Sequence, residues 1–267
     1  MEKLPAKTGW IWIKEGFALF RKQPAEISTL FLAYMFLMLG LNLLQIPILG
    51  QILPVILVPV FAMAFMQACL NIEQGKRVYP NLLLTGFRSP ALKNLLLLGV
   101  LYVIAAIVAI AASSLVDGGL FWLTVTGQST LDPKEIQDSN ISLAMMFAAV
   151  VYIPAAMAFW YAAPLIMWQK MGVLKAIFYS FFAVSRELKA FAVYGLAWAA
   201  IGVVLPAIVS VLIAAIVGNQ SVTIMILLPL SIALTVVMYC SFYPTYTHIF
   251  GRPEQDPPLP EPAAPKE

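Results

Sequence analysis

The sequence contains little charge and few of the residues that build metal or disulfide sites. Of its 267 residues, 11% are charged, two are cysteine and one is histidine, whereas 61% are hydrophobic. Zinc sites and disulfide frameworks require more cysteines or histidines at characteristic spacings. Cys69 and Cys240 both fall in apolar stretches, where cysteine packs as a small apolar side chain. We therefore expect no bound metal and no other cofactor.

Charge is absent from six long apolar stretches. They cover approximately residues 27–50, 52–72, 94–116, 143–168, 191–217 and 222–246. Each has about the 20 apolar residues that a helix needs to cross a hydrocarbon core of about 30 Å. Backbone amides in hydrocarbon need partners within their own segment, which a helix provides. The sequence thus predicts an all-α membrane protein with six transmembrane helices.

The uncharged stretches also limit the chemistry that the protein could perform. Proton relays, ion-coupled antiport and proteolysis by paired aspartates all need ionisable side chains inside the membrane. None of the six stretches contains Asp, Glu, Lys, Arg or His, and the chain has no G-x-S-x-G motif and no phosphate-binding glycine loop. We therefore expect that the protein is not an enzyme and predict no catalytic residue.

The basic residues lie on one side of the membrane that the six apolar stretches are predicted to cross. All 16 Lys and Arg residues except Lys134 fall in the N-terminal arm, the second and fourth connections or the tail. The positive-inside rule then places both termini in the cytoplasm. The first stretch follows a charged arm without a cleavage pattern, so no cleaved signal peptide is expected.

The distribution of these cations also indicates what the protein contacts. A net charge of +3 at pH 7 concentrated at the cytoplasmic edge suggests contact with anionic headgroups. A nucleic-acid partner is not expected, because the basic residues are dispersed among apolar ones. Small residues four apart, such as Ala105 and Ala109, permit close helix packing, either within one bundle or between copies in a homo-oligomer.

An aromatic and basic segment precedes the first, third and fifth stretches, at residues 9–22, 82–90 and 173–182. In the first segment an apolar stripe recurs at helical spacing, formed by Trp10, Ile13, Phe17 and Phe20. Such a helix is expected to lie in the headgroup layer with its tryptophans at the interface. The second, fourth and sixth stretches each end near a glycine, at Gly75, Gly172 and Gly251. The sequence therefore predicts three parallel repeats of an interfacial amphipathic helix plus a helical hairpin.

Three regions follow from these patterns. Residues 1–26 form a cytoplasmic arm with an interfacial helix, and residues 27–250 form the six-helix transmembrane domain. Residues 251–267 form a disordered, proline-rich cytoplasmic tail. The intramembrane prolines, among them Pro164 and Pro244, kink the helices, which either shapes their packing or forms a gate.

Six polar residues are candidates for functional contacts. Arg21, Arg88, Arg186 and His248 lie at the cytoplasmic ends of the predicted helices and are candidate headgroup contacts. Catalysis by His248 is a second interpretation, although no cluster of metal ligands joins it. Gln67 and Asn71 lie in the second stretch, where they either hydrogen-bond between helices or line a polar cavity.

One resemblance covers nearly the whole chain except the tail. Its residues are Gly9-Trp10-x-Trp12-x3-Gly16-Phe17-x2-Phe20-Arg21-x2-Pro24, Trp160…Pro164-Leu165 and Ala176-x3-Ser180-Phe181-x-Ala183. This pattern resembles an uncharacterised family of six-span proteobacterial inner-membrane proteins, similar to membrane domains attached to some glycerophosphodiester phosphodiesterases. The resemblance implies a bacterial inner membrane and six helices. It supplies no activity and no catalytic residue, because no phosphodiesterase domain is attached here.

Two functions are compatible with these features. The first is a non-enzymatic scaffold that assists partners in the inner membrane, and the second is a transporter or lipid-handling protein for an apolar or amphipathic substrate. A lipid-accessible cavity between the repeats, lined by Gln67 and Asn71, would weaken the scaffold hypothesis. A tightly packed bundle without a cavity would contradict the second.

Overall fold

The computed structural model describes residues 3–43, 49–128, 139–217 and 220–253, in which every secondary-structure element is helical. The predicted tail from residue 254 onward and Lys134 lie outside the described residues. Within these ranges, six helical segments are long and apolar enough to cross a membrane: Pro24–Leu41, Ile52–Glu73, Leu92–Asp117, Ile141–Met167, Leu188–Ile213 and Ser221–Phe250. The six predicted transmembrane helices are therefore present, with ends within a few residues of the predicted ones except in the first.

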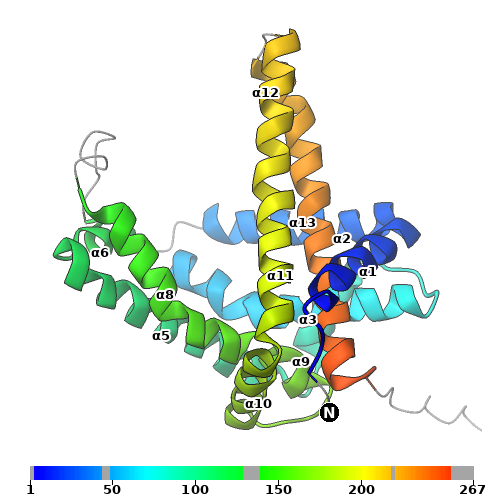
Figure 1. Cartoon of the computed structure of the whole chain (residues 1–267). Helices are drawn as coiled ribbons and strands as arrows, with labels where there is room; N and C mark the ends of the chain where they lie inside the picture. Colours follow the sequence, from blue (N-terminus) through cyan, green and yellow to red (C-terminus); the bar gives the residue numbers. More distant parts are fainter. Residues whose placement is uncertain (1–2, 44–48, 129–138, 218–219, 254–267) are drawn as a thin grey trace, which may run out of the picture.

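The six segments pair as three antiparallel hairpins (Figure 1). The first joins α2 (Pro24–Leu43) to α3 (Leu49–Glu73), the second joins α5 (Leu92–Asp117) to α8 (Ile141–Phe159), and the third joins α11 (Leu188–Ala199) and α12 (Leu205–Val217) to α13 (Gln220–Phe250). Short helices extend them: α6 (Leu120–Val125) follows α5, α9 (Ala162–Met167) follows α8, and η2 (Ala200–Val204) joins α11 to α12. Hairpins two and three diverge from a shared base, which Figure 1 shows as the green and yellow arms.

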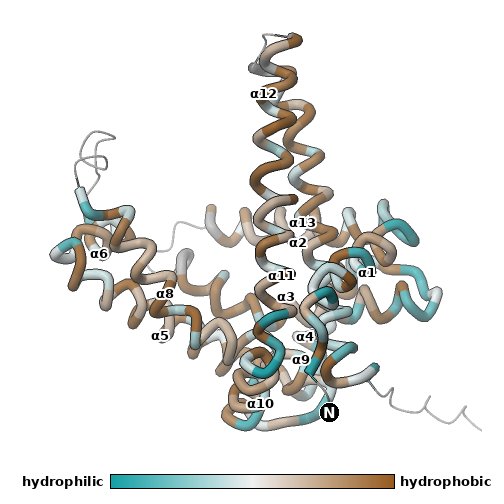
Figure 2. The backbone as a smooth tube through the Cα atoms, in the orientation of Figure 1, coloured by the Kyte–Doolittle hydropathy of each residue, from teal (hydrophilic) through white to brown (hydrophobic). Residues whose placement is uncertain are grey.

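A short helical segment precedes each hairpin, as expected. These segments are α1 (Thr8–Lys22), η1 (Pro80–Leu84) with α4 (Thr85–Arg88), and α10 (Val173–Arg186). Each packs on the hairpin before its own: η1 and α4 contact α2 and α3, and α10 contacts α8 and α9. The first of these segments, α1, has no hairpin before it and instead contacts α11 and α13 of the third hairpin. The three short segments and the three hairpins therefore pack in a closed ring. We call the end where these helices gather the basic end; its hydrophilic segments include those around α1 and α10 in Figure 2.

The buried face of α1 differs from the predicted one. Trp12 is 0% exposed and packs against the rings of Phe191 and Tyr194, whereas Trp10, which belongs to the predicted stripe, is 44% exposed. Trp12 therefore packs inside the protein and is not exposed to headgroups, whereas the position of α1 at the membrane interface stays a prediction. The reason is the close approach of α1 to its neighbours through Gly9 and Gly16, which aromatic spacing alone does not reveal.

The core lies at the basic end, where α3, α9 and α13 meet. Tyr161 is its centre and packs against the rings of Phe242, Tyr246 and Phe250. The helix breaks before α9 because the ring of Pro164 lacks an N–H and would clash with the carbonyl one turn earlier.

The side-chain hydroxyl of Ser180 in α10 supplies hydrogen-bond partners for the backbone at this break. Ser180 Oγ accepts a hydrogen bond from the Tyr161 N–H and donates one to the Met157 carbonyl, both at 2.9 Å. Ser180 is fully buried, so these two bonds replace those that water would supply elsewhere. The contact fixes α10 on the second hairpin.

The glycines that were expected to end the even spans adopt two different backbone conformations. Gly75 and Gly251 have positive φ angles of +73° and +82°, which suit glycine at a helix C-terminus. Gly172 has a φ of −67°, and Lys170 adopts the left-handed conformation instead, with a φ of +52°. Gly172 therefore differs in backbone conformation from Gly75 and Gly251, to which the sequence pattern made it equivalent.

Replacing Gly16 by alanine should destabilise the protein, because the new methyl group would meet the backbone of Ser241. Overpacking of this kind costs about 1–3 kcal/mol. Gly40 in α2 has open space around the same position, so Gly40→Ala should be neutral or stabilising. Thermal unfolding of both variants in detergent checks this, and equal melting temperatures would contradict the close packing of α1 on α13.

Candidate functional site

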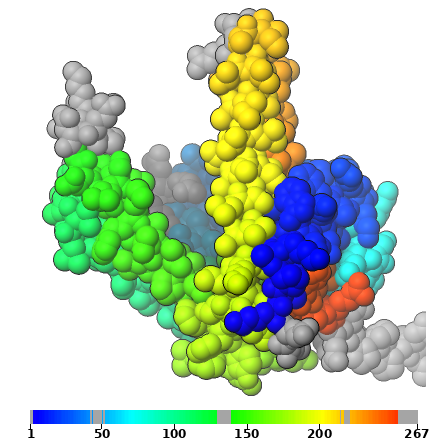
Figure 3. Space-filling view, viewed as in Figure 1, coloured from blue at the N-terminus to red at the C-terminus, as the bar shows by residue number. Residues whose placement is uncertain are grey.

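An apolar cavity of about 780 Å³ lies between the second and third hairpins. Residues from α3, α8, α10, α11 and α13 line it, together with Trp160, and the aromatic residues among them are Phe65, Trp160, Phe191, Tyr194, Trp198, Tyr239 and Phe242. No charged residue is among the lining residues. Figure 3 shows the surface hollowed between the green atoms of α8 and the yellow atoms of α11 and α12. We call this the apolar cavity.

The shape of the apolar cavity depends on small side chains of α11. Ala192 and Gly195 line it, and a Cβ atom built on Gly195 would meet no other heavy atom within 4 Å. Two polar groups nearby are engaged: the Trp198 indole N–H donates to Ser241 Oγ at 3.2 Å, and Tyr194 Oη lies 2.7 Å from the same oxygen. The indole N–H of Trp160, by contrast, is buried without a hydrogen-bond partner among the described residues. The cavity therefore offers apolar surface, which suits a hydrocarbon chain.

A second cavity, of about 810 Å³, lies at the basic end between α3, α4, α9 and the start of α5. Its polar lining residues are Gln67, Thr85, Arg88, Ser89, Asn94 and Lys170, and no acidic residue is among them. Leu70, Ile166 and Met167 add an apolar wall. We call this the basic cavity.

The basic cavity brings together two residues that the sequence singled out separately. Gln67, a candidate cavity residue, and Arg88, a candidate headgroup contact, both line it. Asn71 does not line it; its side-chain oxygen accepts a hydrogen bond from Gln67 Nε2 at 3.1 Å and so orients the Gln67 amide. The basic cavity is thus polar and cationic on one side and apolar on the other.

The other candidate arginines occupy different surroundings. Arg186 lines a further cavity of about 890 Å³ with rings of α10, and its Nε donates to Glu187 Oε1 at 2.7 Å. Glu187 is 1% exposed and also accepts a hydrogen bond from the backbone N–H of Leu4 at 2.7 Å. Arg21 is exposed at the end of α1 and lines none of these three cavities. Their contacts with headgroups stay a prediction.

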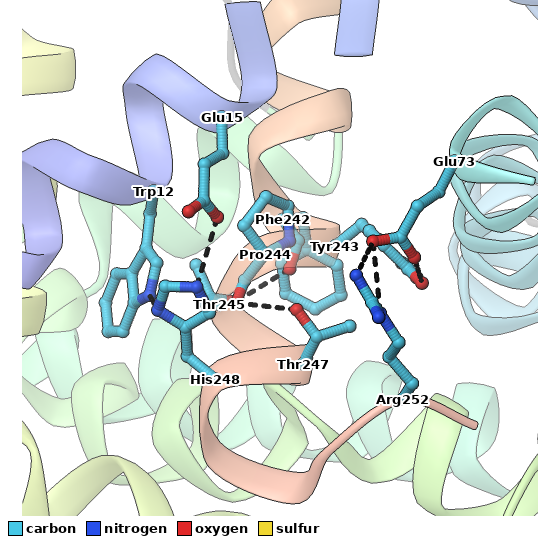
Figure 4. Close-up of polar contacts among 10 residues, drawn as sticks. All are labelled: Trp12, Glu15, Glu73, Phe242, Tyr243, Pro244, Thr245, Thr247, His248 and Arg252. Carbon is cyan, nitrogen blue, oxygen red and sulfur yellow. Dashed lines mark hydrogen bonds and ion pairs between the residues drawn. The ribbon is translucent and has the colours of Figure 1, made fainter. Parts of the chain in front are cut away.

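His248 is held between two side chains of α1 (Figure 4). The Trp12 indole N–H donates to Nδ1 at 3.2 Å, and Nε2 lies 3.2 Å from a carboxylate oxygen of Glu15. Because Nδ1 accepts a hydrogen bond, the ring proton belongs on Nε2, from which it is donated to Glu15. His248 thus fastens α1 to the end of α13, and its predicted contact with headgroups stays untested.

A second polar link joins α3 to the end of α13 (Figure 4). The Tyr243 hydroxyl donates to one oxygen of Glu73 at 2.7 Å, and the Arg252 guanidinium donates to the other at 2.8 and 3.2 Å. Glu15, Glu73 and Glu187 are not among the residues that the sequence singled out, which are basic or amide side chains. Their position among the basic segments is the signal that could have revealed them.

Replacing His248 by phenylalanine should lower stability, because the buried Trp12 N–H would lose its acceptor. An unsatisfied buried donor costs about 1–3 kcal/mol. The double variant Trp12→Phe with His248→Phe should cost less than the sum of the two single changes, since the first change removes the donor. Thermal unfolding of the three variants checks this; strictly additive effects would show that the hydrogen bond contributes nothing.

Comparison with known proteins finds one relative that matches along nearly its entire length. It is described as a probable inner membrane protein of Burkholderia thailandensis and is 37% identical over 269 residues, which cover 99% of this chain and 96% of the relative. The description gives a location and no activity. The chain matches no protein-family model, and no solved structure matches it.

Proposed function

Because the chain belongs to the same family as this Burkholderia inner membrane protein, it is a multi-pass protein of the bacterial inner membrane, and we propose that it handles an amphipathic lipid there. The resemblance that the N-terminal motif carries is thereby confirmed. The proposed role is non-enzymatic: the protein binds the lipid and shields its chain within the membrane.

The apolar cavity is the observation that supports this proposal. It opens between two hairpins that diverge from the basic end, within segments apolar enough to span a membrane. A scaffold needs no such cavity, whereas a lipid-handling protein does. The presence of open cavities, one of them lined by Gln67, therefore favours lipid handling over the scaffold hypothesis.

We propose further that the molecule consists of three parallel units, each an interfacial helix plus a hairpin. The cyclic packing supports this: η1 and α4, α10 and α1 each contact the hairpin that precedes them in the circle. The positions of Ser180 and Gly16 agree, because Ser180 bonds the Tyr161 N–H, three residues before Pro164, and Gly16 lies against Ser241, three residues before Pro244.

The orientation in the membrane is also a proposal, with both termini in the cytoplasm. The bias of Lys and Arg toward the basic end supports it. A reporter fused after Lys266 should show cytoplasmic activity, such as fluorescence of a protein that folds only there. A reporter active only in the periplasm would contradict the orientation, and a fusion at Asn140 serves as the opposite control.

Lipid handling can be tested by filling the apolar cavity. Gly195→Phe introduces a ring at a lining position where a Cβ atom meets no other heavy atom within 4 Å, and Gly202→Phe is a matched control, since its Cβ position is equally open but Gly202 does not line the cavity. The wild-type protein, reconstituted with a phospholipid that carries a photoreactive group on its acyl chain, should be labelled at residues of the cavity. Gly195→Phe should reduce this labelling by about tenfold, and Gly202→Phe should leave it unchanged.

Peptide mapping by mass spectrometry locates the labelled residues. Labelling of Ile153, Ala156 or Leu188, which line the cavity, is the expected result. Labelling confined to the outer surface of α12, with no effect of Gly195→Phe, would contradict lipid handling and favour the scaffold hypothesis.

A further inference from the structure

We propose that one exposed face of α10 inserts into the anionic lipid leaflet at the basic end. We call it the outward face; its residues are 46% to 80% exposed and are Leu174, Phe178, Tyr179 and Phe182. None of them lines the apolar cavity, so the inference goes beyond lipid handling and does not depend on it. It also goes beyond the three-unit arrangement, since it names the side chains that enter lipid and the lipid charge that they select.

The large apolar side chains of α10 point away from the protein. The residues that it buries are small or medium-sized and recur at helical spacing: Val173, Ala176, Ser180 and Val184. Leu174, Phe178 and Phe182 follow one another at four-residue intervals on the exposed side. In water this arrangement would leave the largest apolar surfaces of the helix hydrated, which is unfavourable. The outward face therefore suits an apolar partner outside the chain.

The other short helices place their large rings against the protein. Trp12 of α1 is 0% exposed, and the ring of Phe87 in α4 packs on that of Phe61 in α3. Among the described residues, the ring of Phe178 contacts those of Tyr179 and Phe182, both in α10 itself. The outward face thus differs from the corresponding surfaces of α1 and α4, whose large rings already have partners.

The position of α10 brings the outward face within reach of lipid. Its neighbours along the chain, α9 and α11, belong to the candidate spans Ile141–Met167 and Leu188–Ile213. The helix therefore lies where the fourth span ends and the fifth begins, at the base of the molecule in Figure 1. The headgroup region of a leaflet adjoins the ends of spans, so insertion needs no change of fold.

A cavity of about 890 Å³ beside the outward face gives hydrocarbon a place to enter. Phe178, Tyr179 and Phe182 line it, and Ile249 and Phe250 at the end of α13 also line it. Rings and an aliphatic side chain from two helices thus border the same space. A lipid chain that entered it would bury apolar surface of both helices.

Two lysines next to the outward face favour anionic lipid. Lys175 and Lys189 are exposed, and neither forms an ion pair with a described residue. Lys175 Nζ lies 5.8 Å from the centre of the Tyr179 ring, which places this charge beside the outward face. Arg186 is paired at 2.7 Å with the buried carboxylate of Glu187 and adds no net charge. Lysine side chains can reach headgroups while neighbouring rings lie deeper, and anionic headgroups complement their charge.

The same lysines argue against a second copy of the chain as the occupant. A twofold contact through the outward face would bring identical residues of two copies together. Lys175 would then approach Lys175 of the other copy, and like charges repel. We therefore assign the outward face to lipid.

The depth of the outward face can be measured with nitroxide labels on the full chain in phospholipid bilayers. Cys69 and Cys240 are 0% exposed, so a label attaches to a cysteine introduced by Phe178→Cys or Phe182→Cys. Gln74→Cys is the control, because Gln74 is exposed directly after α3 and lies outside the outward face. We expect the labels at 178 and 182 to lie about 5–10 Å within the lipid, accessible to oxygen and protected from a water-soluble nickel complex. The label at 74 should show the opposite accessibility.

The preference for anionic lipid is tested in the Phe178→Cys background, in phosphatidylcholine bilayers with and without phosphatidylglycerol. Phosphatidylglycerol should increase the depth of the label, and added salt should reduce this effect. Lys175→Gln with Lys189→Gln should abolish the dependence on phosphatidylglycerol, whereas Lys175→Arg with Lys189→Arg, which keeps the charge, should retain it.

Three results would count against the proposal. Equal access of the nickel complex to positions 74, 178 and 182 would overturn insertion, and protection of 178 and 182 from both reagents would show that another protein surface covers them. A depth that does not respond to phosphatidylglycerol would refute the preference for anionic lipid. Acyl labelling of the apolar cavity is read at different residues, so each of these failures would leave lipid handling standing.

Discussion

The docking of each short helix on a neighbouring hairpin is the contact on which the rest of the structure depends. In lipid, helices gain little from hiding apolar surface from each other, so close packing and hydrogen bonds must hold them. Here both are concentrated at the basic end. Gly16 brings α1 against Ser241, His248 fastens the same helix to α13, and Ser180 bonds α10 to the break before α9. The far ends of the hairpins are then free to diverge.

That division explains where cavities form. The aromatic core around Tyr161 is tight, because Phe242, Tyr246 and Phe250 surround it, and the polar links of Glu73 and Glu187 lie beside it at the same level. Away from the core, the buried residues of the segment Leu188–Ile213 are Ala190 and Tyr194, near the basic end, so beyond Tyr194 the third hairpin packs mainly through α12 against α13. An open apolar cavity between the second and third hairpins follows from anchoring the molecule at one end.

The spans could be predicted from the sequence, because bilayer thickness and the absence of charge fix their lengths. The second was expected over 52–72 and occupies Ile52–Glu73. Which face of a helix is buried could not be predicted, since the burial of Trp12 depends on the approach of glycines to partners far along the chain. The meeting of Gln67 with Arg88 likewise depends on how α4 packs on α3, and neither residue carries that information alone.

The two cavities are linked through one helix. Met66 lines the apolar cavity and Gln67 lines the basic cavity, and consecutive residues of a helix point about 100° apart. The wall between the cavities is therefore α3 itself, which also carries Glu73 and its link to Arg252. Since α3 is packed against α9 and α13 in the core, it cannot move toward one cavity without changing the other. A headgroup held beside Arg88 and a chain held beside Phe65 would consequently act on the same rigid element, from opposite sides.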